Sequence, residues 1–298
     1  MSADPPISVV IASYNARETI RLCLRSVLDQ DLEAGFEVVV VDSSNDGTAE
    51  LIREEFPRIC LLHMEGRTSA GEARNVGEAK VTAPFVAFTD ADCIVPRDWL
   101  SRMLERHRDG DYAAVGGSIC NGTPGSLIGS AEHLFAFNEF LPQNPERLVT
   151  NLPTCNISYR RSALAAAQFE GGPKGAYLQA EDLILNWMLA RRGKKLLFDP
   201  EIRVVHLNRT RLMLSLRHQH VLGQSSCWAR KRVDLPGRLF VDFPVLGLVL
   251  PLLRLMRIGV RLSKIDRGET LRFVKLSPLI VLQAGAWAAG FMREALRR

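Results

Sequence analysis

The segment PFVAFTDADCIVP, residues 84–96, joins a strand-like run to a pair of acids. Residues 84–89 are short, apolar and rich in Phe and Val, which is typical of a central strand in a parallel sheet. Asp90 and Asp92 follow, and side chains two residues apart on an extended chain point the same way. A carboxylate is costly to bury unless it is paired or binds a cation. The segment predicts either a cation site at a strand end or a plain surface turn.

The first hundred residues alternate strand-like with helix-like segments. Besides the strand above, apolar β runs lie at residues 7–12, 36–42 and 59–64. Asn15 is a suitable cap for a helix with apolar positions at Ile20, Leu24 and Val27, and further helices are predicted at residues 49–56 and 69–81. Alternation of this kind predicts an α/β fold with a mostly parallel central sheet covered on both faces.

Polar residues follow three of the predicted strands. They lie at residues 13–15, 42–46 and 90–92, and ligands of such sheets bind at the carboxyl ends of strands. The sequence has neither G-x-G-x-x-G after the first strand nor G-x-x-x-x-G-K-[ST], the loops that cradle phosphate with backbone N–H groups. A bound diphosphate therefore needs another source of positive charge. Mg²⁺ or Mn²⁺ held by Asp90 and Asp92 would supply it.

Five sequence blocks together resemble the family 2 glycosyltransferases, which have the GT-A fold. In chain order, over roughly residues 6–230, they are VVIASYN, VVVDSSNDGT, SAGEARNVGEAKVTAPFVAFTDADC, CNISYRR and AEDLILNWML. The resemblance implies a hexosyltransferase-type enzyme that moves a sugar from a UDP- or GDP-sugar to an acceptor hydroxyl, with a metal ion and with inversion.

The resemblance assigns the donor site first. It places Ser13 and Tyr14 beside the nucleotide base, and gives Asp42 a contact with the base or ribose. Many members carry two adjacent acids at this point, whereas this chain has Asp42-Ser43.

The A-R-N block and the D-x-D block complete the implied donor site. Arg74 and Asn75 match A-R-N, whose Arg helps to hold the nucleotide and its acidic partners; a solvated helix face is the alternative. Asp90 and Asp92 match the D-x-D that binds the metal bridging the diphosphate oxygens, with Asp90 also contacting the substrate.

The resemblance assigns the catalytic step to Glu181 and Asp182. Asp182 is expected to deprotonate the acceptor hydroxyl, with Glu181 orienting the acceptor or the site, because an inverting transfer needs a base on the face opposite the nucleotide. Two acids at a helix start are also typical of simple capping charges. His206, after the apolar run IRVV, matches a histidine that some relatives place near the metal, although a structural role is the alternative.

Charge is unevenly distributed along the 298 residues. Residues 191–298 hold 22 Lys/Arg against 7 Asp/Glu, whereas residues 1–190 are acidic overall. A basic segment suits an anionic partner, and because this one is also apolar, a membrane surface is favoured over nucleic acid. The six scattered cysteines, without C-x-x-C spacing, indicate a reducing compartment. No secretory signal is visible at the N-terminus, and we expect a location at the cytoplasmic face of the inner membrane.

We expect a catalytic domain at residues 1–235 and a basic, apolar helical tail at 236–298. The uncharged runs at residues 243–253 and 276–292 are short for spanning helices, which need about 20 apolar residues. Helices lying in the cytoplasmic leaflet, with the intervening Arg and Lys at anionic headgroups, are therefore predicted. Those basic residues are Arg254, Arg257, Arg261, Lys264, Arg267, Arg272 and Lys275. A helical hairpin packed on the body, or at the interface of a homo-oligomer, is the alternative.

Two further functions stay open at this stage. A nucleotidyltransferase shares this style of sheet but should carry a glycine-rich loop where this chain has ASYNARET. A non-catalytic membrane scaffold derived from a glycosyltransferase should have lost the D-x-D or the catalytic base.

The acceptor is expected to be lipid-linked or a glycan precursor of the cell envelope, with residues 121–149 covering the acceptor side of the site. Processive synthases of the family carry a Q-x-x-R-W motif. This motif is absent from the sequence, which favours addition of a single sugar.

Overall fold

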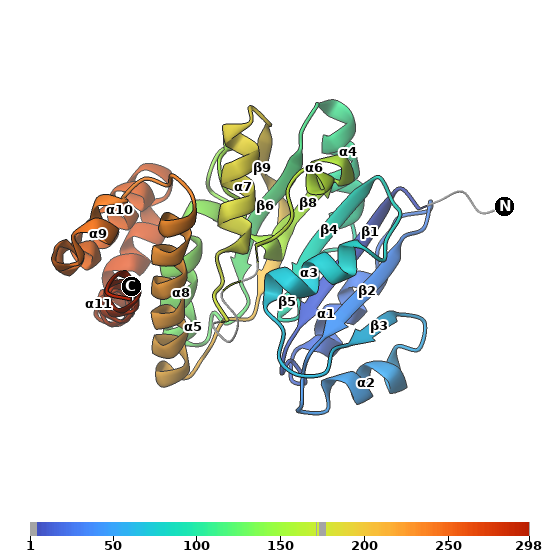
Figure 1. The fold of residues 1–298 in the computed structure, drawn as a ribbon, viewed down its shortest axis with the longest axis horizontal. Helices are drawn as coiled ribbons and strands as arrows, with labels where there is room; N and C mark the ends of the chain where they lie inside the picture. The colour runs from blue at the N-terminus through green and yellow to red at the C-terminus, as the bar shows by residue number, and fades with distance from the viewer. Residues whose placement is uncertain (1–4, 171, 173–176, 298) are drawn as a thin grey trace. The chain divides into compact units, whose positions relative to one another are not determined.

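The computed structural model describes residues 5–170, 172 and 177–297, which form two compact units (Figure 1). The first unit comprises Met1–Cys120, Pro145–Tyr177 and Glu181–Val205. The second comprises Asn121–Asn144, Leu178–Ala180 and His206–Arg298. The division between the two units does not fall at residue 235. That two separate domains occupy residues 1–235 and 236–298 stays a prediction.

The first unit is built on one mixed β-sheet. Its strand order is β3 (Cys60–His63), β2 (Glu37–Asp42), β1 (Ile7–Ser13), β4 (Phe85–Asp90), β8 (Ile157–Arg160), β6 (Ala114–Asn121), β9 (Leu196–His206) and β5 (Cys93–Ile94), with β7 (Arg147–Val149) paired to β9. The strands β1 to β4 are parallel, whereas β8 runs antiparallel to both β4 and β6. The α/β class is confirmed, and the parallel half contains the strand ends at which a ligand is predicted to bind.

Helices cover this sheet. They are α1 (Ile20–Leu28), α2 (Thr48–Glu55), α3 (Ala70–Glu78), α4 (Trp99–Asp109), η2 (Thr154–Asn156), α6 (Arg161–Ala165) and α7 (Glu181–Arg191). Ser69 caps α3 by accepting a hydrogen bond from the backbone N–H of Glu72. Asn15 does not cap α1, because it adopts a left-handed φ of 50° in a turn and the helix begins only at Ile20.

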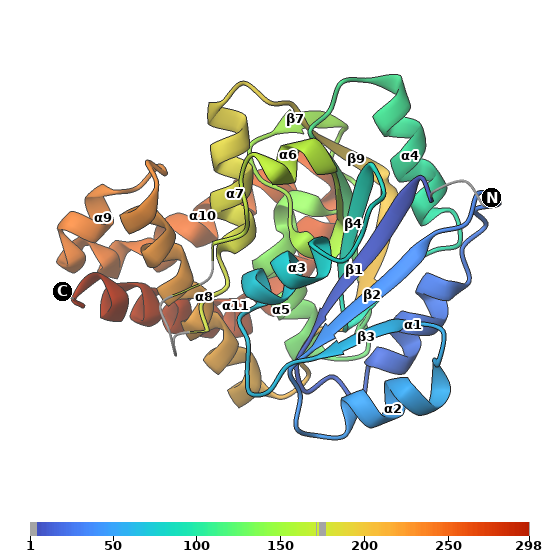
Figure 2. The same ribbon diagram turned by 45° about the vertical axis from the view of Figure 1, so that its right-hand side comes forward.

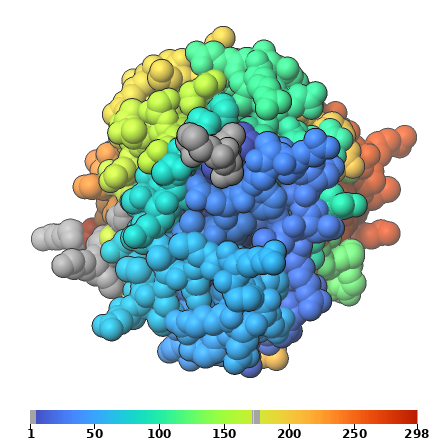
Figure 3. All heavy atoms as spheres, turned by 90° about the vertical axis from the view of Figure 1, so that its right-hand side faces the viewer, coloured from blue at the N-terminus to red at the C-terminus, as the bar shows by residue number. Residues whose placement is uncertain are grey.

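The helix α3 packs closely on β1 and β2 (Figure 2). The approach requires a glycine, because a Cβ at Gly77 would lie 2.4 Å from Cγ1 of Val10. From the right-hand side of Figure 1, the segment from β1 to α2 covers the centre and lower part of the first unit's surface, in blue (Figure 3). The close packing of α3 fixes the position of Arg74 in its middle.

Asn156 braces the antiparallel part of the sheet. Its fully buried amide nitrogen donates to the carbonyl oxygens of Ser118 and Ile202, and its oxygen accepts from the indole N–H of Trp99. The side chain thus satisfies backbone groups of β6 and β9 that would otherwise be buried unpaired. The block CNISYRR therefore has a structural role at this position.

The second unit consists of helices. They are α5 (Leu127–Phe137), η1 (Asn138–Phe140), α8 (Leu212–Arg232), α9 (Leu239–Asp242), η3 (Pro244–Val249), α10 (Leu250–Ile265) and α11 (Arg267–Ala295). The core of this unit joins α5, α8, α10 and α11, so the predicted tail is helical but packs with segments from earlier in the chain. Glycines allow α8 and α11 to touch. A Cβ at Gly223 would lie 1.9 Å from the carbonyl oxygen of Trp287, and one at Gly290 would lie 1.9 Å from that of His220.

Two identical substitutions in α11 should have opposite effects on the free energy of unfolding. Gly290→Ala forces α8 and α11 apart, and overpacking of this kind costs about 1–3 kcal/mol. Gly285→Ala, on the same helix, meets nothing within 4 Å and should stabilise by up to about 1 kcal/mol through helix propensity. Urea unfolding of both variants measures the difference. Equal effects would contradict the close packing at Gly290.

Candidate active site

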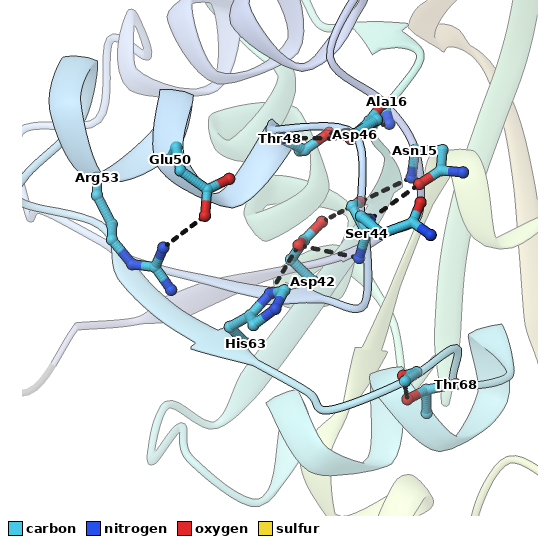
Figure 4. A network of polar contacts seen from close by, with 12 residues as sticks. Asn15, Ala16, Asp42, Ser44, Asp46, Thr48, Glu50, Arg53, His63 and Thr68 are labelled. Carbon is cyan, nitrogen blue, oxygen red and sulfur yellow. Dashed lines mark hydrogen bonds and ion pairs between the residues drawn. The ribbon is translucent and has the colours of Figure 1, made fainter.

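A polar network ties together the turns that follow β1 and β2 (Figure 4). Asp42 is fully buried and accepts hydrogen bonds from the backbone N–H and the hydroxyl of Ser44, at 3.1 and 2.6 Å. Its Oδ2 also lies 3.0 Å from Nδ1 of His63. The Ser44 hydroxyl in turn accepts from the backbone N–H of Asn15 at 2.7 Å. Asp42 therefore holds the turns after β1 and β2 together, and its contact with a nucleotide stays a prediction.

His63 was not identified from the sequence. It closes β3, the strand beside β2, and about a third of its side chain is exposed. The available signal was its position, because β3 ends on the same edge of the parallel sheet as Asp42. A ring held by a buried carboxylate at this edge is suited to binding a polar ligand.

The planar guanidinium of Arg67 packs on two aromatic rings, one of which follows β1. The guanidinium carbon of Arg67 is 4.4 Å from the ring centroid of Tyr14 and 3.8 Å from that of Tyr177. Tyr14 is 40% exposed, whereas Ser13 is buried and its hydroxyl has no hydrogen-bond partner among the described residues. Stacking of this kind orients Tyr14, the residue predicted to lie beside the base. Arg67 lies outside the recognised blocks, so the sequence did not point to it.

Arg74 connects the end of β4 to the start of α7. It is 4% exposed, its Nη2 lies 2.8 Å from Oδ1 of Asp90, and its Nη1 donates to Oε1 of buried Glu181. Gly71 makes room, because a Cβ there would lie only 3.0 Å from Cβ of Glu181. A solvated helix face, the alternative for Arg74, is therefore wrong. The predicted nucleotide contact of Arg74 stays a prediction.

Asp90 and Asp92 form an acidic strand end that suits a hard cation. The side chain of Asp90 is 33% exposed and that of Asp92 is half-buried. The pKa of the Cys23 thiol is raised well above its usual range, first by burial and then by the negative charges of Asp92 and Asp90. The two carboxylates therefore create a negative potential that extends into the core, and oxygen ligands fit Mg²⁺ or Mn²⁺.

Asp182 has the protonation behaviour of a catalytic base. Burial, followed by the charge of Glu181, raises its pKa from the ordinary 3.8 to about 7, while Arg74 and two backbone N–H groups act in the opposite direction. Those groups belong to Leu183, at 2.7 Å from Oδ1, and Thr154, at 3.4 Å from Oδ2. A carboxylate oriented in this way and titrating near neutral pH can accept a proton from a hydroxyl.

Asn75 and His206 have structural contacts of their own. The Asn75 amide donates to the carbonyl oxygen of Phe169 at 2.8 Å and accepts from its N–H at 3.1 Å. His206 closes β9 at the start of the second unit, where its Nδ1 lies 3.1 Å from Oδ1 of Asn208. The donor contact of Asn75 and the metal contact of His206 stay predictions.

Comparisons with known sequences agree on one family. The profile described as Glycosyl transferase family 2 matches residues 8–166. The chain is 32% identical over 123 residues to "Glycosyltransferase AglE" of Haloferax volcanii, covering 40% of each protein. It is 27% identical over 306 aligned positions to the "Pre-mycofactocin glycosyltransferase" of Mycobacterium tuberculosis, covering 95% of this chain and 62% of that protein. The chain thus spans between 40 and 62% of the length of these relatives.

The fold also matches a solved structure over its whole length. The mannosyltransferase PcManGT of Pyrobaculum calidifontis, in complex with GDP-Man and Mn²⁺, superposes with a TM-score of 0.65 at 19% identity. The match covers 99% of this chain and 88% of that one. At this identity the likeness shows the fold alone, and it confirms the predicted GT-A architecture.

Removing the buried cation should destabilise the first unit strongly. Arg74→Met leaves Asp90 and Glu181 without their shared partner, and breaking a buried ion pair costs about 3–5 kcal/mol. Arg102→Met is the matched control, because the Arg102–Asp98 pair is about 40% exposed on both sides and exposed pairs contribute little. Urea unfolding at pH 7 measures both variants.

A second change identifies the origin of that loss. Adding Glu181→Gln to Arg74→Met removes one of the unpaired charges and should recover part of the lost stability. If Arg74→Met were no more harmful than Arg102→Met, the guanidinium would not hold the site together.

Proposed function

Because the chain belongs to the family 2 glycosyltransferases, we propose that it transfers a sugar from a UDP- or GDP-sugar to an acceptor hydroxyl, with inversion and with a bound divalent cation. Buried Arg74 carries the proposal. Its guanidinium pairs with Asp90, on the proposed donor side, and with Glu181, the neighbour of the proposed catalytic base Asp182. The GDP-Man and Mn²⁺ complex of the similar mannosyltransferase supports this choice of donor and cofactor.

The donor side of the proposed site is the rim of the parallel strands. Tyr14, stacked on Arg67, offers a flat surface to the base, and Ser13 offers a buried hydroxyl next to it. Asp90 and Asp92 would hold Mg²⁺ or Mn²⁺, which supplies positive charge to the departing diphosphate. Arg74 keeps Asp90 in place, so that its carboxylate does not need to find its orientation when the donor arrives.

The acceptor side is the start of α7. Asp182 accepts the proton of the acceptor hydroxyl while the acceptor oxygen bonds to the anomeric carbon and the bond from that carbon to the diphosphate breaks. The N–H groups of Leu183 and Thr154 orient the carboxylate. A single displacement with the base opposite the leaving group inverts the anomeric configuration. Glu181 is buried and bound to Arg74, so its proposed role is to position Asp182.

The second unit bears on the acceptor and its location. We propose a lipid-linked acceptor or another glycan precursor of the cell envelope, met at the cytoplasmic face of the membrane. Among the described residues, α11 alone is long and apolar enough to cross a membrane. An 18-residue window of this helix has a mean hydropathy of 1.3, and 39% of that window is buried inside the protein. Such a helix supports attachment to a membrane surface.

Neutralising either acid of the strand end should strongly reduce metal-dependent turnover. Asp90→Asn and Asp92→Asn should each lower the Mn²⁺-stimulated release of nucleoside diphosphate by about 100-fold or more, because a metal at a developing charge contributes several kcal/mol. Asp98→Asn, at a surface pair, is the control and should keep full activity. Release of pyrophosphate in place of nucleoside diphosphate would reveal a nucleotidyltransferase and sink the proposal.

The pH profile should report Asp182. As pH rises through about 7, the carboxyl ionises and becomes able to accept a proton, so kcat/KM should rise through this range. Asp182→Asn should lower kcat by about 10²–10⁴-fold and remove the rise of kcat/KM with pH, while donor binding is retained.

Stability should show the same titration with the opposite sign. Because the folded-state pKa is raised, the folded protein holds a proton that the unfolded chain releases between pH 3.8 and about 7. The contribution of Asp182 to stability therefore falls as pH rises through this window, and Asp182→Asn should gain stability relative to the wild type from pH 5 to pH 8. A pH–stability profile that is unchanged in the variant would contradict the raised pKa of Asp182.

A further inference from the structure

The helix α10 presents an apolar stripe to the outside. The stripe comprises Leu252, Met256 and Val260 of α10, which are 58, 57 and 54% exposed, and Leu248 of η3 just before it, which is 70% exposed. A spacing of four residues places the three α10 side chains along one side of that helix. Leu271 and Val274 at the start of α11 are similarly exposed, at 63 and 61%. A run of large apolar side chains of this kind marks an interaction surface.

Several arginines of the same helices point inward. The Arg254 guanidinium lies 4.1 Å from the ring centroid of Phe135 and 4.6 Å from that of Trp287, and burial lowers its pKa to about 10. Arg261 pairs with Glu139 at 2.8 Å, and Arg272 donates to the Ser130 hydroxyl at 3.1 Å. These three were expected to meet lipid headgroups; each is partly buried and bound to other groups of the unit, and the headgroup contact stays a prediction. Part of the positive charge of these helices is therefore bound to the unit, while large apolar side chains face outward.

The remaining exposed charges on these helices are positive. Arg257, Lys264, Arg267 and Lys275 are exposed. The acids are not: Asp266 caps α11 through the N–H of Glu269, Glu269 pairs with Arg272, and Glu294 is buried. Over the described residues 250–297, the outer surface thus combines apolar and basic groups without an exposed acid. This surface is complementary to an anionic lipid surface.

A second copy of the chain fits this surface less well. A two-fold contact would bring the same patch of each subunit together and so oppose like charges. A bilayer-spanning position also conflicts with the packing. One side of α11 is buried against the unit through Ile280, Ala284 and Phe291, and Gln283 bonds to Ser215 of α8.

We propose that the stripe of α10 inserts into the interface of an anionic bilayer, with Arg257, Lys264 and Lys275 at the headgroups, so that the protein lies on one leaflet. This inference deepens the membrane location in the proposed function by naming the surface that meets the lipid. Insertion is driven by burial of the apolar side chains, and the basic residues select anionic lipid.

Vesicle co-sedimentation of the full chain tests this assignment. Wild-type protein should bind vesicles of phosphatidylglycerol and phosphatidylcholine, and bind pure phosphatidylcholine more weakly. Leu252→Ser/Met256→Ser/Val260→Ser should weaken binding to the mixed vesicles by about tenfold or more. The matched control is Leu22→Ser/Leu28→Ser/Leu148→Ser, three exposed leucines of the first unit, and it should bind as the wild type does. Arg257→Gln/Lys264→Gln should reduce the preference for anionic lipid.

The outcomes separate this inference from the catalytic proposal. Thermal unfolding and Mn²⁺-dependent release of nucleoside diphosphate, measured without lipid, should be unchanged in the stripe variant, because the stripe is remote in sequence from the donor residues and is exposed. Equal loss of binding in the control, or absence of wild-type binding to either vesicle, would overturn the assignment. So would a stripe variant that turns a dimer into a monomer on size exclusion while vesicle binding stays the same, because the occupant would then be a second copy.

Discussion

The site depends on one buried cation, the guanidinium of Arg74. It pairs with Asp90 at the end of β4 and with Glu181 at the start of α7, two residues that are far apart in sequence. A charge can be buried in this way only when its partners offset the lost hydration. The glycines of α3 make the geometry possible, since Gly77 lets the helix approach β1 and Gly71 leaves room for Glu181. The same contact therefore sets the position of Asp90, on the proposed donor side, and the position of α7, which carries Asp182.

The same cation separates the roles of the two neighbouring acids. Glu181 binds Arg74 directly, whereas Asp182 is affected only by the electrostatic field of Arg74. This field lowers the pKa of Asp182, while burial and the charge of Glu181 raise it. Two adjacent carboxylates in different surroundings commonly divide into a charged structural partner and a group that titrates near neutral pH. The raised pKa of Asp182 thus follows from which acid the guanidinium contacts. A Lys at position 74 could not contact both acids through separate N–H groups of a planar fork.

Local patterns predicted the parallel half of the sheet and the strand end with its acids. The β4 strand ends at Asp90, one residue beyond the predicted run, and Ser69 caps α3. The sequence did not predict contacts made by distant segments. The start of α1 was misplaced because the side chain of Asn15 accepts from the N–H of Asn45 and thereby holds a turn. The stacking of Arg67 on Tyr177 could not be inferred, because periodicity carries no information on which loops meet.

The charge of the C-terminal segment shows a second limit of composition. A count of basic residues predicts attraction to anionic lipid but not the direction in which each side chain points. Arg254 points inward because α5, from more than 100 residues earlier, supplies Phe135 to its core. Lys231 likewise donates to the carbonyl oxygens of Glu294 and Arg297 at the end of α11, at 2.6 and 2.8 Å. An apolar exterior suits lipid only when the polar groups beneath it find partners within the protein. In this unit Arg254, Lys231 and Gln283 have such partners, so the outward stripe on α10 is compatible with the internal structure that supports it.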